Sequence, residues 1–169
     1  MPRMTVPSTR TIALATAVMA GVALGFAWVL QHWVGLAPCA LCLLERWPYR
    51  VIVVLGLIAF LLPTGAARTL LWLAVLAALA DVVLGVVHVG VEQHFWPSPL
   101  PECAAPTFSG GSIADMLKSM PSHPAKPCDA ANYLIPGLPL SLAAMALLYA
   151  AALVLLLSGL VWQSGRHQT

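Results

Sequence analysis

Three long stretches of the chain carry almost no charge, and this pattern limits what the chain can fold into. Residues 11–30 and 138–162 contain no charged side chain, and residues 69–91 contain only Asp81. A helix of roughly 20 apolar residues crosses a hydrocarbon core about 30 Å thick. Soluble domains carry about 25% charged residues, whereas this chain of 169 residues carries 8%. The sequence therefore predicts an all-α membrane protein.

A further helix is expected between the first two of these stretches, although its apolar part is short. Residues 51–62 alone are too few to cross a bilayer. Extended back to Cys42, the helix takes in Pro48, which predicts a kink, together with Glu45, Arg46 and Arg50 near the interface. The predicted fold class is a bundle of four transmembrane helices forming one membrane domain over residues 1–169, with spans at about 11–31, 42–62, 69–91 and 138–162.

Four crossings bring both termini to one side of the membrane and leave two loops on the other. A turn over residues 63–68 lies on the side of the termini, and the loops opposite cover about residues 32–41 and 93–137. Within the longer loop, residues 112–120 combine a capping-box spacing with an apolar i, i+3, i+4, i+7 repeat. This combination predicts a short helix on the membrane surface. Each side carries four Lys and Arg residues, so the charge count leaves the orientation to the cysteines.

Two of the four cysteines form a C-x-x-C motif at the expected start of the second helix. Cys39 and Cys42 follow Pro38, a residue that favours the first turn of a helix. A helix N-terminus stabilises a thiolate, which makes such a pair reactive. Arg46 lies one turn beyond Cys42 on the same face and adds positive charge beside that sulfur. The motif therefore favours thiol redox chemistry.

The other two cysteines, Cys103 and Cys128, lie in the longer loop on the same side of the membrane. Four thiols could bind zinc, but the loop pair lacks the close spacing of common zinc sites, so no metal is expected. Two inert structural disulfides are the second alternative. A bridge between Cys39 and Cys42 closes too small a loop to restrain much chain entropy. Redox activity is therefore the stronger interpretation.

These residues resemble a known family. The run Pro38-Cys-Ala-Leu-Cys-Leu-Leu-Glu-Arg46, the later Trp96-Pro-Ser-Pro99 and the loop cysteines resemble the bacterial disulfide bond formation protein B (DsbB) family over nearly the whole chain. The resemblance implies that Cys39 and Cys42 lie near a quinone and that Arg46 is its neighbour. It implies that Cys103 and Cys128 meet a soluble, thioredoxin-like thiol oxidase of the DsbA type.

The implied activity is that of a quinone-dependent thiol oxidase of the bacterial inner membrane, with its cysteines facing the periplasm, where disulfides persist. The partner dithiol would attack the Cys103–Cys128 disulfide, with Cys103 as the sulfur attacked. Electrons would pass to Cys39 and Cys42 and then to the cofactor, ubiquinone or menaquinone. The expected partners are the DsbA-like protein, the quinone and the lipid bilayer. Nucleic acid is not expected, because the eight basic residues are few and scattered.

The third span carries a polar face that quinone reduction could use. Asp81, Gly85, His88 and Glu92 are spaced by four, three and four residues and share one face of a helix. Ionisable groups inside a span are rare and usually functional. Reduction of a quinone consumes two protons, so His88 is a candidate for proton delivery or quinone contact. The alternative is a polar residue paired inside the bundle for packing.

Two other functions remain open at this stage. The first is a quinone-linked thiol reductase resembling the vitamin K epoxide reductases, which share the helix count but carry their C-x-x-C on the last helix. The second is a small transporter or assembly factor that uses Asp81 as its coupled charge, and its activity would survive replacement of all four cysteines.

Overall fold

A computed structural model of the chain describes residues 7–103, 126–135, 137 and 139–166. Its four long helices are α1 (Thr9–His32), α2 (Ala40–Leu61), α3 (Thr64–Glu92) and α5 (Leu142–Arg166), and a short 3₁₀ helix, η1, covers Pro101–Cys103. The described residues contain no strand, which confirms the all-α class. The surface helix expected over residues 112–120 lies outside the described residues.

Three of the long helices have the length and composition of membrane spans: α1, α3 and α5 have mean hydropathies of 2.1, 2.6 and 2.4. The fourth, α2, has 22 residues but carries Glu45, Arg46 and Arg50 in its first half. Apolar helices of this length match the thickness of a hydrocarbon core, so the chain is a membrane protein with these three helices as candidate spans.

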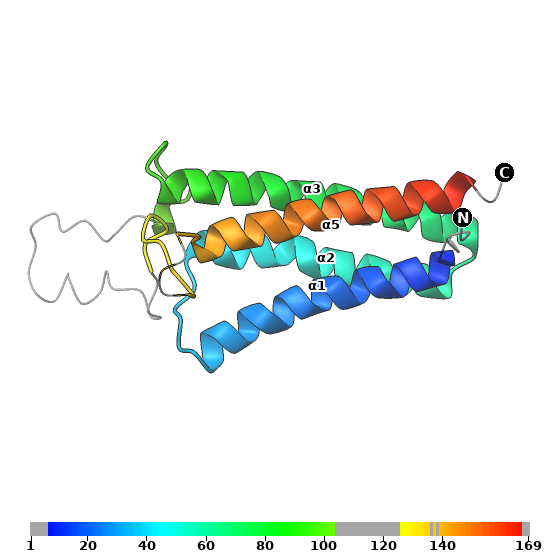
Figure 1. Cartoon of the computed structure of the whole chain (residues 1–169), viewed down its shortest axis with the longest axis horizontal. Coiled ribbons are helices and arrows are strands. Elements are labelled where there is room, and N and C mark those ends of the chain that lie inside the picture. The colour runs from blue at the N-terminus through cyan, green and yellow to red at the C-terminus, as the bar shows by residue number, and fades with distance from the viewer. Residues whose placement is uncertain (1–6, 104–125, 136, 138, 167–169) are drawn as a thin grey trace, which may run out of the picture.

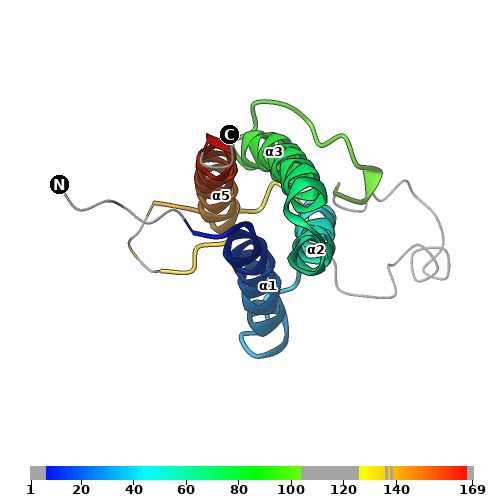
Figure 2. The same ribbon diagram turned by 90° about the vertical axis from the view of Figure 1, so that its right-hand side faces the viewer.

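The long helices lie side by side as a bundle, with both termini at one end (Figure 1). α1 packs on α2, α2 on α3 and α3 on α5, whereas α1 and α5 touch over a smaller surface. Towards the end away from the termini, α1 diverges from the other helices (Figures 1 and 2). That end also receives the start of α2, η1 and the segment that leads into α5.

Helix boundaries follow local caps. Cys39 caps α2 with its own sulfur, which accepts a hydrogen bond from the Cys42 N–H at 3.1 Å, and the helix then continues through Pro48. The turn expected over residues 63–68 is shorter than predicted: extended backbone at Leu62 and Pro63 reverses the chain, and α3 begins at Thr64. Likewise α5 begins at Leu142, because the Ser141 hydroxyl accepts the Ala144 N–H at 3.1 Å.

Small residues set the spacing of the helices. At Gly56 of α2, an added Cβ would lie 2.9 Å from the backbone nitrogen of Ala17 and 3.0 Å from the carbonyl oxygen of Ala13 on α1. At Gly85 of α3, an added Cβ would lie 3.1 Å from the side chain of Leu147 on α5. Lipid tails are as apolar as the helix surfaces, so close packing of small residues is a main source of helix association in membranes.

Replacing Gly56 by leucine should therefore destabilise the bundle. The side chain would push α1 away from α2, and overpacking typically costs about 1–3 kcal/mol. The matched control is Gly21→Leu, because an added Cβ at Gly21 meets no atom within 4 Å. The midpoint of SDS-induced unfolding in mixed micelles should fall for the first variant and stay near that of the parent protein for the second. Equal midpoints for both variants would contradict the close approach at Gly56.

Candidate functional site

The C-x-x-C motif forms a disulfide at the first turn of α2. Cys39 and Cys42 are bonded to each other, with their Cα atoms 5.1 Å apart. Cys39 is buried, whereas Cys42 is half-buried and lines a cavity. The pair lies at the N-terminus of α2, where the Cys42 N–H donates to Cys39 Sγ, so negative charge on that sulfur is favoured.

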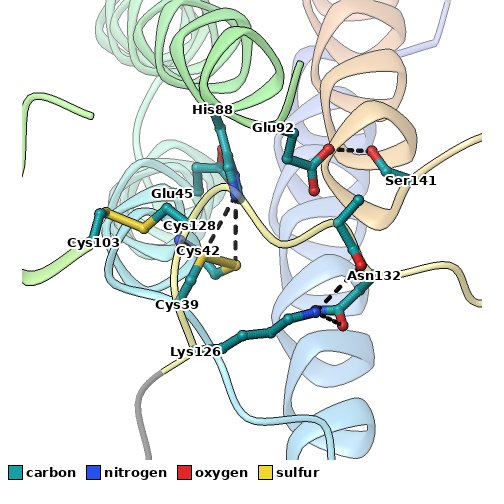
Figure 3. Close-up of a disulfide and its surroundings, with 11 residues drawn as sticks. Cys39, Cys42, Glu45, His88, Glu92, Cys103, Lys126, Cys128, Asn132 and Ser141 are labelled. Atoms are coloured by element: carbon teal, nitrogen blue, oxygen red, sulfur yellow. Dashed lines mark hydrogen bonds and ion pairs between the residues drawn. A yellow bond between two sulfur atoms is a disulfide. The ribbon is translucent and has the colours of Figure 1, made fainter. Parts of the chain in front are cut away.

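His88 reaches this disulfide from α3. Its Nε2 lies 3.5 Å from Cys39 Sγ and 4.0 Å from Cys42 Sγ. On the other side of the ring, Nδ1 lies 2.9 Å from Oε1 of Glu45, one turn beyond Cys42 on α2. An ionised carboxylate only accepts hydrogen bonds, so Nδ1 carries the proton that is donated to Glu45. Glu45 therefore fixes the ring with Nε2 towards the two sulfur atoms (Figure 3).

The second disulfide packs against the first. Cys103 at the end of η1 is bonded to Cys128, and the Cys128 N–H donates to the Cys103 carbonyl at 3.3 Å. Cys39, Cys103 and Cys128 belong to one buried cluster with Leu41 and Val91, and Cys42 packs against it. Figure 3 shows the two sulfur pairs next to each other above the start of α2.

The end of α3 directs the chain towards this cluster. His94, with a φ of 58°, follows the helix, and the His94 and Phe95 N–H groups donate to the carbonyls of Val91 and Gly90. This is the Schellman pattern of helix termination. The Trp96 ring then folds back over Gly90, where a Cβ would overlap it, and its Nε1 donates to a carbonyl of the preceding turn of α3 at 3.1 Å. The chain thereby returns to η1 and Cys103.

Polar contacts also stabilise the elements that surround the cysteines. Arg46 Nη1 donates to Oε1 of Gln31 at the end of α1, at 2.8 Å. The buried Ser141 hydroxyl, which also caps α5, donates to Oε2 of the buried Glu92 at 2.5 Å. Lys126 donates to the side chain of Asn132 in the segment that leads into α5. These contacts connect α1 to α2 and α3 to α5 at the end of the bundle that carries the cysteines.

A cavity of about 390 Å³ lies between the diverging end of α1 and the starts of α2 and α5. Its walls are mainly apolar, a character typical of small-molecule sites, which span roughly 300–1,000 Å³. Its polar lining comes from side chains on all sides, among them Gln31, Cys39, Cys42, Glu45, Arg46, His88, Glu92 and Lys126.

Most residues singled out from the sequence meet at this cavity. Cys39, Cys42, Arg46, His88 and Cys128 line it, and Cys103 lies behind them as the bonded partner of Cys128. Asp81 does not line it. That residue is buried on α3, and its Oδ1 has no hydrogen-bond partner among the described residues.

Sequence reasoning missed two contributors to the site, Glu45 and Gln31. The sequence marks Glu45 only as a charge of α2 near the interface, although it follows Cys42 by three residues and so shares its face of the helix. Nothing in the sequence pairs Glu45 with His88, 43 residues away. Gln31, 15 residues from Arg46, carried no signal.

Comparisons with known proteins agree on one family. The family model for disulfide bond formation protein DsbB matches residues 9–160. A disulfide bond formation protein B of Aromatoleum aromaticum is 36% identical over 121 residues, which are 71% of this chain and 69% of that protein. Its counterpart in Azoarcus sp. is 30% identical over 142 residues, 78% of this chain and 81% of that protein. No solved structure matches the chain significantly.

Apolar helices with two adjoining disulfides at one end define a membrane oxidoreductase that acts in disulfide bond formation. The chain belongs to the DsbB family of disulfide bond formation proteins. This confirms the resemblance drawn from the C-x-x-C motif and its surroundings.

The pairing of the four cysteines can be checked directly. Protein purified without reductant and alkylated under denaturing conditions should give one disulfide-linked species joining Cys39 to Cys42 and another joining Cys103 to Cys128, because no cysteine is free. Mass spectrometry of the peptides before and after reduction measures this. Four free thiols, or bound zinc in the resting protein, would contradict redox use of these pairs.

Proposed function

We propose that this protein is a thiol oxidase of the bacterial inner membrane. It re-oxidises a periplasmic, thioredoxin-like dithiol oxidase of the DsbA type and passes the electrons to ubiquinone or menaquinone. The observation that carries the proposal is the position of the Cys39–Cys42 disulfide: one face meets a largely apolar cavity, and the other packs against the Cys103–Cys128 disulfide. Electrons can then enter through one pair and leave from the other.

The cavity suits a ring with polar oxygens and an apolar tail. Arg46 and His88 supply the polar contacts beside Cys42, and the remaining walls are mainly apolar. The lining continues along α1 to Val22 and Phe26, which are exposed on the side of the bundle, so an entering ligand would come from the lipid. A bound quinone accepts two electrons and two protons and supplies the oxidising power.

The protein's residues would act in sequence. A partner thiolate attacks the Cys103–Cys128 disulfide, which forms a mixed disulfide and then leaves both loop sulfurs reduced and the partner oxidised. A loop thiolate next attacks the Cys39–Cys42 disulfide, which restores the loop bridge and reduces the inner pair by two electrons. The helix N-terminus stabilises a thiolate there, and His88 Nε2 can take up the proton of the thiol. Both loop sulfurs are buried, so docking must uncover them first.

We further propose that α2 crosses the membrane despite its charges, which places both termini in the cytoplasm and all four cysteines at the periplasmic side. Glu45 is paired with His88, and Arg46 is hydrogen-bonded to Gln31, so neither side chain needs water for a partner. Arg50 lies over the ring of the exposed Trp47, at 4.9 Å. This cation–π contact gives the Arg50 charge a partner on its own helix.

No specific observation favours the two other functions. In the vitamin K epoxide reductase arrangement the C-x-x-C belongs to the last helix, whereas Cys39 caps α2 in this chain. A transporter that uses Asp81 needs a cavity at that residue, and Asp81 does not line the cavity described here.

Arg46→Ala should weaken quinone use while leaving oxidation of the partner by the loop pair intact. Loss of one charge-assisted contact costs roughly 1.5–3 kcal/mol, or about ten- to a hundred-fold in apparent affinity for a short-chain ubiquinone. Steady-state quinone reduction measures the first effect, and a single turnover with reduced partner measures the second. The matched control is Arg50→Ala, because Arg50 does not line the cavity. Unchanged quinone kinetics combined with failed loop oxidation would refute this role for Arg46.

The topology can be tested with single reporter cysteines in a variant whose four native cysteines are serine. Val34→Cys and Glu102→Cys introduce thiols at exposed positions near the native cysteines, and Gly65→Cys introduces one at the other end of the bundle. A membrane-impermeant thiol reagent applied to intact cells should label the first two variants, and Gly65→Cys only after lysis. Labelling of Val34→Cys or Glu102→Cys alone would place the loops on opposite sides and refute four crossings.

A further inference from the structure

Cys39, Cys42 and His88 bring three metal-binding atoms to one point. Their sulfur and nitrogen atoms all lie within 4.8 Å of one another. In the disulfide form the sulfurs are bonded to each other and carry no thiolate, so they are poor ligands. Reduction of the bridge changes this, because a thiolate is the form of cysteine that binds metal.

We propose that reduction of Cys39–Cys42 creates a binding site for a thiophilic divalent cation of the Zn²⁺ class, with both sulfurs and His88 Nε2 as ligands. A cation bound there holds the pair reduced and stops electrons from leaving it. The proposal does not depend on a quinone, because it needs only the reduced pair and the histidine. It also differs from a four-thiol zinc site, since Cys103 and Cys128 take no part.

The distances fit such a site. Tetrahedral zinc with Zn–S near 2.3 Å and Zn–N near 2.0–2.1 Å places sulfur and nitrogen about 3.6 Å apart. Nε2 lies 3.5 Å from Cys39 Sγ and 4.0 Å from Cys42 Sγ. Reduction breaks the S–S bond and lets the two sulfurs separate to the spacing that the metal requires. Two cysteines spaced C-x-x-C are also a common half of zinc sites.

Glu45 prepares the histidine for this role. A metal-bound histidine usually donates its other N–H to a carboxylate, which fixes the tautomer and raises the basicity of the ligand nitrogen. Glu45 accepts the Nδ1–H at 2.9 Å, which leaves Nε2 of the neutral imidazole as the ligand atom, and this nitrogen faces the sulfurs (Figure 3). The cavity beside the pair leaves a fourth position for water, as in zinc sites with three protein ligands.

A dithiol and the cation are the only reactants that this site requires. A dithiol reduces the bridge by two electrons and two protons and itself becomes a disulfide. With a neutral imidazole at His88, the cation then displaces two protons, one from each thiol. Release of the cation returns the free dithiol. Binding is therefore gated by the redox state of the pair.

The first test uses Cd²⁺ alone as the probe, on full-length protein in detergent in which Cys103 and Cys128 are both serine. Anaerobic titration of the reduced protein should give thiolate-to-cadmium absorption that saturates at about one ion per chain, with release of about two protons. The oxidised protein should give no such band. Equal binding by both forms, or no saturable band in the reduced form, would overturn the proposal.

The second test separates a three-ligand site from two thiolates that bind a cation alone. Glu45→Gln should weaken Cd²⁺ binding about ten- to a hundred-fold, and His88→Ala should weaken it at least as much. Co²⁺ should give the intense visible bands of a tetrahedral site in the parent protein and lose them in His88→Ala. His32→Ala is the matched control, because His32 does not line the cavity.

Unchanged Cd²⁺ affinity and an unchanged Co²⁺ spectrum in His88→Ala would reduce the site to the two thiols and refute the proposal. Monodisperse elution of each variant shows that it has folded. Glu45→Gln keeps the shape of the side chain, so its result stands even if His88→Ala fails to fold. None of these measurements involves a quinone, so failure here and failure of the proposed oxidase activity are distinguishable.

Discussion

The contact between Glu45 and His88 is the interaction on which the rest of the site depends. A largely buried charged side chain needs a partner within the protein, and Glu45 finds one on the neighbouring helix at 2.9 Å. The same contact joins α2 to α3 beside the C-x-x-C and turns the imidazole towards the sulfurs. Helix packing and redox geometry are therefore set by one hydrogen bond. Replacing either partner leaves the other buried side chain without its hydrogen bond, which is costly.

The second constraint is the close packing of two disulfides that are distant in the sequence. The proposed exchange between the two pairs requires one sulfur to reach another along its S–S bond, so the loop pair would have to lie against the inner pair. The Schellman turn after α3 and the Trp96 ring over Gly90 bring Cys103 to that place. Burial of Cys39, Cys103 and Cys128 in one cluster shields this contact from solvent, whereas Cys42 faces the cavity. In the proposed cycle, a partner would have to uncover the buried Cys103 and Cys128 before it could react.

Much of the fold follows from the sequence because a helix that crosses lipid needs about 20 mostly apolar residues. The uncharged lengths predict α1, α3 and α5, and the start of α2 follows from Pro38 and the cysteine that caps it. The first residues of α3 and α5 are less predictable from the sequence. Ala-rich residues after Pro63 extend α3 backwards, and the Ser141 hydroxyl delays the start of α5. For the site, residue type and spacing identified the cysteines, Arg46 and His88. The contacts that orient them, from Glu45 and Gln31, join different helices, and no local pattern encodes such pairs.

The same arrangement that stabilises a thiolate also exposes the protein to metal. The helix N-terminus favours negative sulfur, and the Nε2 lone pair of His88 can either take up the thiol proton before electron transfer or bind a cation directly. The disulfide protects against the second outcome, since bonded sulfurs are poor ligands. The protein is therefore vulnerable only while the inner pair is reduced. Rapid removal of electrons from Cys39 and Cys42 would shorten that interval, so turnover itself limits access of a cation to the site. A stalled enzyme that accumulates dithiol would have no such protection.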